Sequence, residues 1–215
     1  MMVSPRRAVL WILAALLSLP VLPLARVSAQ IDTSQPYFLV ATRDLGDPNF
    51  AHSVVLILPS RTLPIVLGVI INRPTTMQVQ QLFEHAPVFK KPANTAFFGG
   101  PVDVEQPSLI RHVKTPEPSA IPISGDLYLS IDPRSVPNVL QSAAPDTQIR
   151  LYLGRAQWSP LQLRREVAEG SWFVEPADTR LIFSTDPARV WTTLVNRGFL
   201  TDNADPHKLM LALER

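Results

Sequence analysis

Cysteine is absent from this chain of 215 residues. Without a thiol the protein has no disulfide bond, no thiolate metal site, no thiol nucleophile and no Cys-linked lipid. Its stability must therefore come from its hydrophobic core alone. Sequence repeats and low-complexity tracts are absent too, and the 22 prolines are spread along the chain, mostly where predicted elements begin.

Runs of basic residues are also missing, and this absence bears on the partners of the protein. The chain has 20 Lys and Arg residues against 18 Asp and Glu residues. Three of the arginines and none of the acids lie in residues 1–29, so the remainder carries 17 basic against 18 acidic side chains. A nucleic-acid-binding surface needs clustered positive charge to contact phosphates. We therefore expect no nucleic-acid partner.

The start of the chain has the layout of a secretory signal peptide. Arg6-Arg7 form a positive N-terminal region, residues 8–19 form an apolar stretch, and Val27-Ser28-Ala29 form a small-residue cleavage site. We predict that residues 1–29 are a signal peptide and that cleavage leaves Gln30 as the first residue. The predicted location is periplasmic or secreted.

An uncleaved membrane anchor is the alternative reading of the same segment. Residues 8–25 carry no charge and approach the length of a spanning helix. They would tie the protein to the inner membrane, and no other membrane contact is expected. Pro20 and Pro23 would break such a helix near its end, which favours cleavage. The pair Arg6-Arg7 matches a twin-arginine signal only in part, so the choice between Sec and twin-arginine export stays open.

Apolar stretches rich in β-branched residues predict strands that are buried on both faces. These stretches are residues 37–41, 53–58, 65–71, 97–98, 127–129 and 149–153. Strands that alternate with short helices predict an α/β domain with a mixed sheet.

Four helix starts are predicted, at Thr75, Asp132, Ser159 and Asp186. Thr75 and Ser159 are each followed three residues later by Gln, which is a capping-box pattern. Asp132 and Asp186 are each followed by proline, which is favoured at the first helical position. Gly170 and Gly198 are predicted to adopt the left-handed conformation after a helix end.

The helix after Ser159 supports a more detailed prediction. The hydroxyl of Ser159 should accept a hydrogen bond from the amide of Gln162, and the Gln162 side chain should reach back to the Ser159 amide. Leu163 and Val167 lie four residues apart and should face the core. Trp158 and Trp172 flank the segment and should pack it onto the sheet.

Five short motifs follow one another along the chain. They are Asp47-Pro48-Asn49-Phe50, Gly68-Val69-Ile70-Ile71-Asn72-Arg73-Pro74, Phe98-Gly99-Gly100-Pro101, Leu153-Gly154-Arg155-Ala156-Gln157-Trp158 and Trp172-Phe173-Val174-Glu175-Pro176-Ala177-Asp178. In this order they resemble the AlgH/YqgE family of bacterial proteins, from about Tyr37 to about Gly198. The resemblance implies a single domain over residues 30–215, with a mixed, branched sheet curled toward a pseudo-barrel and flanking helices. The family has no established reaction, so the resemblance names no substrate.

The loops of these motifs contain the candidate binding residues, which are Asp47, Asn49, Asn72, Arg73, Gly99 and Gly100. Arg73 ends a predicted strand beside a predicted helix start, where backbone amides would attract an anion. The alternative is that Arg73 pairs with Asp47 or Asp44 and joins two loops. The short Gly99-Gly100 turn is more typical of a close backbone approach than of a phosphate cradle.

No residue pattern indicates catalysis or a cofactor. His52 and Ser53 are neighbours, so on a strand their side chains point to opposite faces and His52 cannot activate Ser53. The histidines lack the spacing of metal ligands, and we expect neither a metal nor a cofactor. The sequence favours a non-enzymatic binding or regulatory protein of the cell envelope, with a small anionic ligand or a protein as its partner. The alternative is a hydrolase or another small-ligand enzyme that uses the same loops.

Overall fold

The computed structural model describes residues 35–59, 64–83, 95–132, 134–143 and 147–201. The predicted signal peptide and the alternative anchor lie outside these residues. In the described part, no helix is long and apolar enough to cross a membrane.

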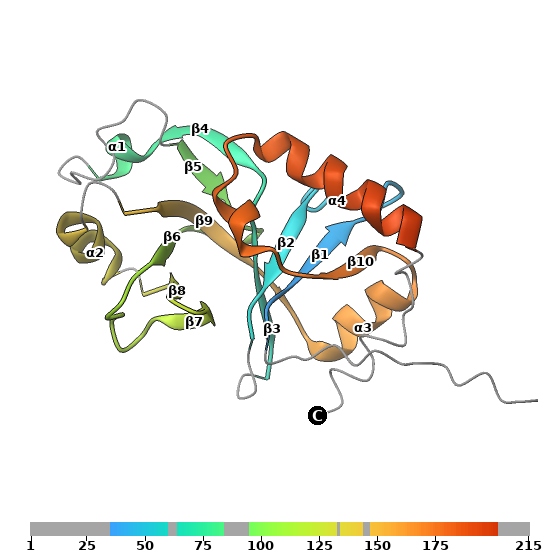
Figure 1. Cartoon of the computed structure of the whole chain (residues 1–215), viewed down its shortest axis with the longest axis horizontal. Helices are drawn as coiled ribbons and strands as arrows, with labels where there is room; N and C mark the ends of the chain where they lie inside the picture. Colours follow the sequence, from blue (N-terminus) through green and yellow to red (C-terminus); the bar gives the residue numbers. More distant parts are fainter. Residues whose placement is uncertain (1–34, 60–63, 84–94, 133, 144–146, 202–215) are drawn as a thin grey trace, which may run out of the picture.

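In the described residues, ten strands form a curled sheet (Figure 1). They are β1 (Tyr37–Ala41), β2 (Val54–Ile57), β3 (Val66–Ile70), β4 (Pro74–Gln78), β5 (Thr95–Phe98), β6 (Val102–His112), β7 (Ile121–Ser124), β8 (Leu127–Ser130), β9 (Ile149–Trp158) and β10 (Trp172–Pro176). Their order is β10-β1-β2-β3-β9-β6-β8-β7, with β5 also on β9 and β4 on β5. The pairs are antiparallel except for β5 and β9, so the sheet is mixed as predicted.

Strand β9 is the branch point of the sheet. Its C-terminal part pairs with β3, where Gly68 is opposite Ala156. Its N-terminal part pairs with β6, where Pro107 is opposite Leu153. Gly154 lies between the two parts and has a positive φ of 73°, a conformation that glycine adopts without strain. The sheet therefore splits at Gly154 into two wings that curl into a half-barrel with flanking helices.

Three apolar clusters hold the helices on the sheet, because the strands bury side chains on both faces. The inside of the curl is closed by α4 (Pro187–Thr201) and a 3₁₀ helix (Thr179–Phe183). The outer face of the β1–β2–β3 wing is covered by α3 (Pro160–Ala168). The outer face of the β6–β9 wing is covered by α2 (Val136–Ser142) and the four-residue α1 (Val79–Leu82).

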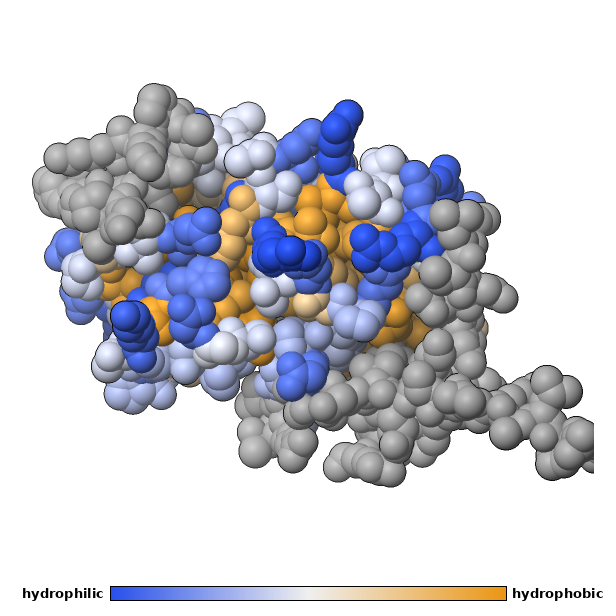
Figure 2. Space-filling view, in the orientation of Figure 1, coloured by the Kyte–Doolittle hydropathy of each residue, from blue (hydrophilic) through white to orange (hydrophobic). Residues whose placement is uncertain are grey.

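The exposed large apolar side chains of the described residues are scattered over the molecule. They are Met77, Leu82, Val104 and Leu161. Figure 2 shows the same pattern on one face, where apolar atoms reach the surface between polar side chains.

The predicted helix start at Thr75 is wrong. Residues 74–78 form strand β4, and the Thr75 hydroxyl donates to the carbonyl of Ala96 over 2.7 Å. Pairing with β5 overrides the local capping pattern, and the β-branched pair Thr75-Thr76 suits a strand. The short helix that follows begins only at Val79, where the amide of Gln78 donates to Oε1 of Gln81 over 3.1 Å.

Two other helix ends also differ from the prediction. Helix α2 begins at Val136, about one turn after Asp132, whose carboxylate accepts from the Arg134 amide in a turn instead. Gly198 lies inside α4, where a Cβ would come within 2.7 Å of the Phe173 ring. Glycine allows α4 to pack closely on Phe173 there, because any larger residue would collide with the ring. At Asp186 and Gly170 the predictions are confirmed, since Asp186 accepts from the Arg189 amide and Gly170 has a φ of 79°.

Helix α3 confirms most of its prediction. The Ser159 hydroxyl accepts from the Gln162 amide over 3.1 Å, and Leu163 and Val167 are buried. The Gln162 side chain differs from the prediction, because it donates forward to Oε1 of Glu166 over 2.9 Å. Trp158 and Trp172 are both buried, and their indole nitrogens share Oε2 of Glu166 at 3.0 and 2.9 Å.

Candidate functional site

The loop that begins at Asp47 is a tight turn held by its own backbone. The Asp47 carbonyl accepts from the amides of Phe50 and Ala51, over 3.0 and 2.7 Å. Its carboxylate accepts from the Asn49 amide over 2.8 Å, as an aspartate that begins a turn often does. Phe50 then packs against the rings of Trp158 and Trp172, with centroids 5.4 and 5.6 Å away.

Arg73 joins this loop to the end of β3 in a way that the sequence did not predict. Its guanidinium donates to the carbonyls of Asn49 and Ala51, over 2.7 and 2.8 Å. The prediction of an ion pair with Asp47 or Asp44 is wrong, since no pair of Arg73 occurs within 4.0 Å in the described chain. Burial lowers the pKa of Arg73. The negative charge of Asp47, which lies beyond ion-pair distance, acts against this shift.

Asn72 uses both ends of its side-chain amide to hold the start of β2. Its Oδ1 accepts from the Val54 amide over 2.8 Å, and its Nδ2 donates to the His52 carbonyl over 3.0 Å. Only 9% of the residue is exposed. The side chain thus satisfies the buried Val54 amide and ties the carbonyl of His52, in the preceding loop, to the end of β3.

Gly99 and Gly100 lie against the backbone of β9. A Cβ on Gly99 would lie 2.3 Å from the Gly154 carbonyl oxygen, and one on Gly100 would lie 2.3 Å from the Arg155 carbonyl carbon. The Gly99 amide donates to Leu153, and its carbonyl accepts from the Ile70 amide, both over 2.8 Å. The predicted close approach of the backbone is confirmed, and it occurs beside Gly154, where the sheet branches.

The structure therefore brings the predicted binding residues together, but most of their polar atoms already form hydrogen bonds within the protein. Asp47, Asn49, Asn72 and Arg73 meet at one edge of the β1–β2–β3 wing, and Gly99-Gly100 lie next to them because the Phe98 amide donates to the Arg73 carbonyl. The predicted anion site at a helix start beside Arg73 does not form, because residues 74–78 are a strand. The exposed side chains of Asp47 and Asn49 remain accessible there.

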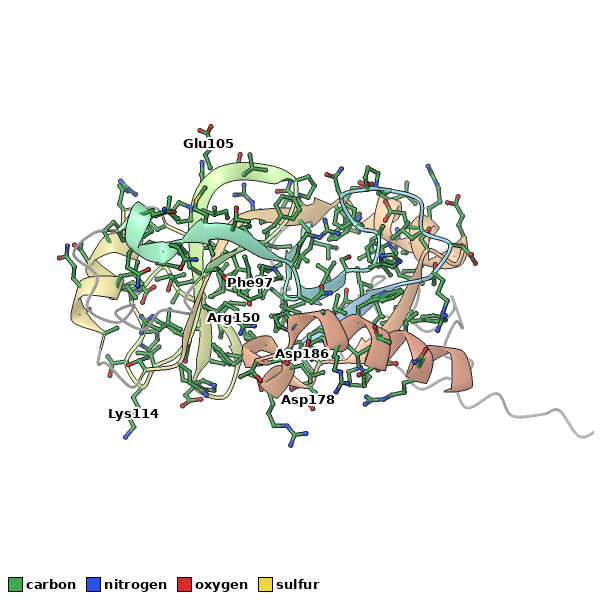
Figure 3. The ribbon with its side chains drawn as sticks, turned by 90° about the horizontal axis from the view of Figure 1, so that it is seen from above. Phe97, Glu105, Lys114, Arg150, Asp178 and Asp186 are labelled. Carbon is green, nitrogen blue, oxygen red and sulfur yellow. The ribbon has the colours of Figure 1, made fainter. Side chains whose placement is uncertain are left out.

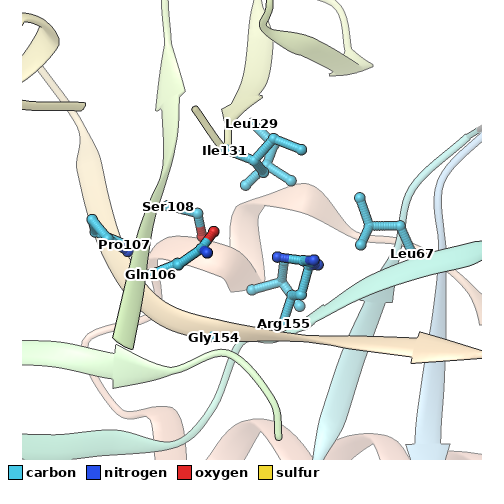
Figure 4. Close-up of a pocket in the computed structure, with 9 residues that line it drawn as sticks. Leu67, Gln106, Pro107, Ser108, Leu129, Ile131, Gly154 and Arg155 are labelled. Atoms are coloured by element: carbon cyan, nitrogen blue, oxygen red, sulfur yellow. The ribbon is translucent and has the colours of Figure 1, made fainter. Parts of the chain in front are cut away.

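A pocket that the sequence did not predict lies where the two wings separate (Figure 4). It is shallow and open to solvent, and its cavity volume is about 10 Å³, which is room for about one water molecule. Its lining residues come from β3, β6, β8, β9 and the residue after β8. They are Leu67, Val69, Gln106, Pro107, Ser108, Leu129, Ile131, Gly154 and Arg155.

The polar groups of this pocket stand opposite an apolar wall. Arg155 projects into it from β9, and in Figure 4 its side chain lies between Leu67 on one side and Gln106 and Ser108 on the other. The guanidinium forms an ion pair with Asp103 of β6. The Ser108 hydroxyl is buried and has no hydrogen-bond partner among the described residues. Local sequence patterns do not predict that Arg155 and Ser108 meet, because β6 and β9 pair with an irregular register between Val102 and Pro107.

His52 and Ser53 do not form a catalytic pair. The Ser53 hydroxyl is buried without a hydrogen-bond partner in the described chain. His52 is exposed with a positive φ of 59°, and its ring lies 4.3 Å from the ring of Trp191. The described residues also contain no group of three or more His, Asp or Glu side chains placed to bind a metal.

The half-buried Arg150 and the buried Glu175 fix the elements that close the curl. Arg150 lies over the Phe97 ring at 4.2 Å and donates to the carbonyls of Ile182 and Ser184, which secures the 3₁₀ helix (Figure 3). Glu175 of β10 is 3% exposed, and its Oε2 lies 3.5 Å from Nη1 of Arg197 on α4. Burial raises the pKa of Glu175, although Arg197 acts against this shift.

Comparison with known sequences supports the predicted resemblance. A family model described as AlgH-like (DUF179) matches residues 38–199. A UPF0301 protein of Thermobifida fusca is 34% identical over 170 residues, which are 74% of this chain and 84% of the relative. A UPF0301 protein of Myxococcus xanthus is 30% identical over 172 residues, which are 79% of this chain and 92% of the relative.

Comparison with solved structures supports the fold. The solution structure of the AlgH protein from Pseudomonas aeruginosa matches with a TM-score of 0.59 and 25% identity, over 79% of this chain and 93% of that chain. A crystal structure of a Corynebacterium diphtheriae protein matches with a TM-score of 0.61 and 22% identity, over 78% and 88% of the two chains. The sequence match and the branched half-barrel agree, and the chain belongs to the AlgH-like family.

Proposed function

We propose that this protein is an exported, non-enzymatic binding protein of the cell envelope and that its ligand contacts the surface around the shallow pocket between β3, β6, β8 and β9. One observation carries the proposal. The described residues that line the pocket combine apolar walls with the polar side chains of Arg155, Gln106 and Ser108, and none of them is His, Asp or Glu. A concave site with a few convergent polar groups is typical of ligand binding, whereas hydrolysis needs a base or a nucleophile with a partner.

Export and the envelope location are supported by the sequence of residues 1–29. The positive, apolar and small-residue regions of that segment occur in the order that a secretory signal requires. The remainder of the chain has a nearly balanced charge and no basic cluster in the sequence, which fits a small ligand or a protein partner better than nucleic acid.

Ligand binding at the loop surface of Asp47, Asn49, Asn72 and Arg73 stays a prediction with weaker support. Asn72 and Arg73 already donate to backbone carbonyls, and a ligand would have to displace these bonds. Gly99 and Gly100 are buried against β9 and present no open cradle. A ligand at the pocket would not have to displace hydrogen bonds to backbone carbonyls.

A thermal-shift screen of the purified protein with small anionic metabolites tests the proposal. We expect at least one compound to raise the melting temperature, because a ligand that binds only the folded state stabilises it. Gln106→Trp at the rim of the pocket should abolish this shift by blocking the mouth. Glu105→Trp is the matched control, because Glu105 is exposed and points away from the body of the molecule (Figure 3).

The outcomes separate the two candidate surfaces and the two classes of function. A shift that survives Gln106→Trp but disappears with the double change Asp47→Ala and Asn49→Ala would move the site to the loops. Turnover of the binding compound into a product, measured by mass spectrometry, would contradict the non-enzymatic assignment.

A further inference from the structure

The size of the pocket at the branch of the sheet limits what can enter it. Its cavity volume is about 10 Å³, which is close to the space that one water molecule needs. A metabolite of even a few carbon atoms is too large for this space. Whatever enters the pocket is therefore a water molecule or a single small ion.

Three polar side chains converge on this space. Ser108 is 5% exposed, and its hydroxyl has no hydrogen-bond partner in the described chain. Gln106 lies beside it on β6, and the side chain of Arg155 reaches the same space from β9 (Figure 4). A water molecule inside a protein needs about two to four polar partners, and these side chains can supply that number.

The charges at the pocket favour water over an ion. The guanidinium of Arg155 already forms an ion pair with Asp103, and the described lining residues include no other charged side chain. An anion would bring an unpaired charge beside the apolar side chains of Leu67 and Leu129, and a cation would lie against the guanidinium. A water molecule adds no charge, and it can both donate and accept hydrogen bonds.

The position of the pocket gives such a water a role in the fold. Ser108 belongs to β6 and Arg155 to β9, and these strands pair with an irregular register between Val102 and Pro107. A water between the two side chains links the strands beside the place where their ladder is interrupted. It also provides the partner that the buried hydroxyl of Ser108 needs, because a buried polar group without a partner lowers stability.

We propose that the pocket is a binding site for one structural water molecule. The water accepts a hydrogen bond from the Ser108 hydroxyl and bridges it to the side chains of Gln106 and Arg155. This inference goes beyond the binding function proposed above and does not depend on it. A ligand on the surrounding surface contacts the water from outside and does not enter the pocket.

Two buried serines allow a test by urea unfolding. Ser108→Ala removes the hydroxyl that binds the water, so the urea concentration at the midpoint of unfolding should fall. Ser53→Ala is the matched control, because Ser53 is also buried without a partner in the described chain but does not line the pocket. Its midpoint should stay the same or rise, because the change removes a buried hydroxyl that has no partner.

A high-resolution crystal structure of the unaltered protein locates the water directly. We expect one density peak at hydrogen-bond distance from Oγ of Ser108, and we expect Ser108→Val to remove it because a methyl group then occupies the space. A pocket without a peak would overturn the proposal, and so would a higher midpoint for Ser108→Ala. A midpoint that changes when chloride is replaced by another anion in the parent, but not in Ser108→Val, would show that an ion is bound instead. The thermal-shift screen with Gln106→Trp decides the binding function separately.

Discussion

At the scale of single residues, the candidate polar side chains divide into those that donate hydrogen bonds to the backbone and those that face the pocket. Asn72 and Arg73 follow the buried strand β3 and donate to carbonyls of the neighbouring loop. Arg155 instead projects from the branch of the sheet toward the pocket, with its charge balanced by Asp103. Both arginines follow glycine-containing motifs, so only the direction of the side chain distinguishes their roles.

Glu175 provides a prediction about pH. Its carboxylate is buried and its Oε1 has no partner in the described chain, so burial raises its pKa. The protonated form is favoured in the folded protein, and the stability that it contributes is present at low pH and lost as the pH rises through the raised pKa. Glu175→Gln should therefore stabilise the protein at pH 7–8 and have no effect near about pH 4, below the ordinary pKa of glutamate.

Urea unfolding at pH 4, 6 and 8 measures this difference. Glu105→Gln is the control, because Glu105 is exposed and its replacement should give no pH-dependent difference. A Glu175→Gln protein that is less stable than the parent at pH 8 would show that the contact with Arg197 outweighs the burial of the charge.

At the scale of elements, the branch of the sheet depends on glycines that allow strands β5 and β9 to touch. Gly99→Ala would place a Cβ 2.3 Å from a backbone oxygen of Gly154, where no flexible side chain can move away. We expect a loss of about 1–3 kcal/mol or more in the free energy of unfolding, as for overpacked cores. Gly46→Ala should stay within about 0.5 kcal/mol, because no atom lies within 4 Å of its added Cβ.

Thermal and urea unfolding of both alanine variants measures the comparison. Equal stability of the two variants would mean that β5 and β9 move apart at little cost in free energy. The size of the pocket beside Gly154 would then vary.

Helix α3 permits a comparison between a capping bond and a packed ring. Ser159→Ala removes the hydroxyl that accepts from the Gln162 amide and should cost about 0.5–2 kcal/mol. Trp158→Ala should cost about 3–5 kcal/mol, because the ring is buried beside Phe50 and Trp172 and its removal leaves a cavity. Urea unfolding measures both, and the reverse ranking would mean that the aromatic cluster relaxes around the missing ring.

At the scale of the whole molecule, the prediction concerns the form in which the protein exists in the cell. We expect protein from the envelope fraction to begin at Gln30, because Val27-Ser28-Ala29 is a small-residue cleavage site after an apolar stretch. Intact-mass spectrometry of that fraction measures the first residue. A dominant species that keeps residues 1–29 would favour the membrane anchor, and protein found only in the cytoplasmic fraction would contradict export.

The sequence alone was enough to predict features that depend on neighbouring residues. The apolar stretches at 37–41, 53–58 and 65–71 predicted β1, β2 and β3, because a run of β-branched residues favours a buried strand wherever it pairs. Ser159 predicted the start of α3, because the capping bond spans only three residues. The motif order predicted the family and with it the half-barrel.

Only the tertiary structure decided the features that depend on distant strands. Thr75 carries a capping pattern, but pairing with β5 makes its segment a strand, because interstrand hydrogen bonds outweigh one local cap. Arg73 donates to loop carbonyls because the turn after Asp47 places them nearer than any carboxylate in the described chain. The pocket arises because β3 and β6 leave β9 at Gly154 in different directions, and this bend brings Arg155, Ser108 and Leu129 around one space.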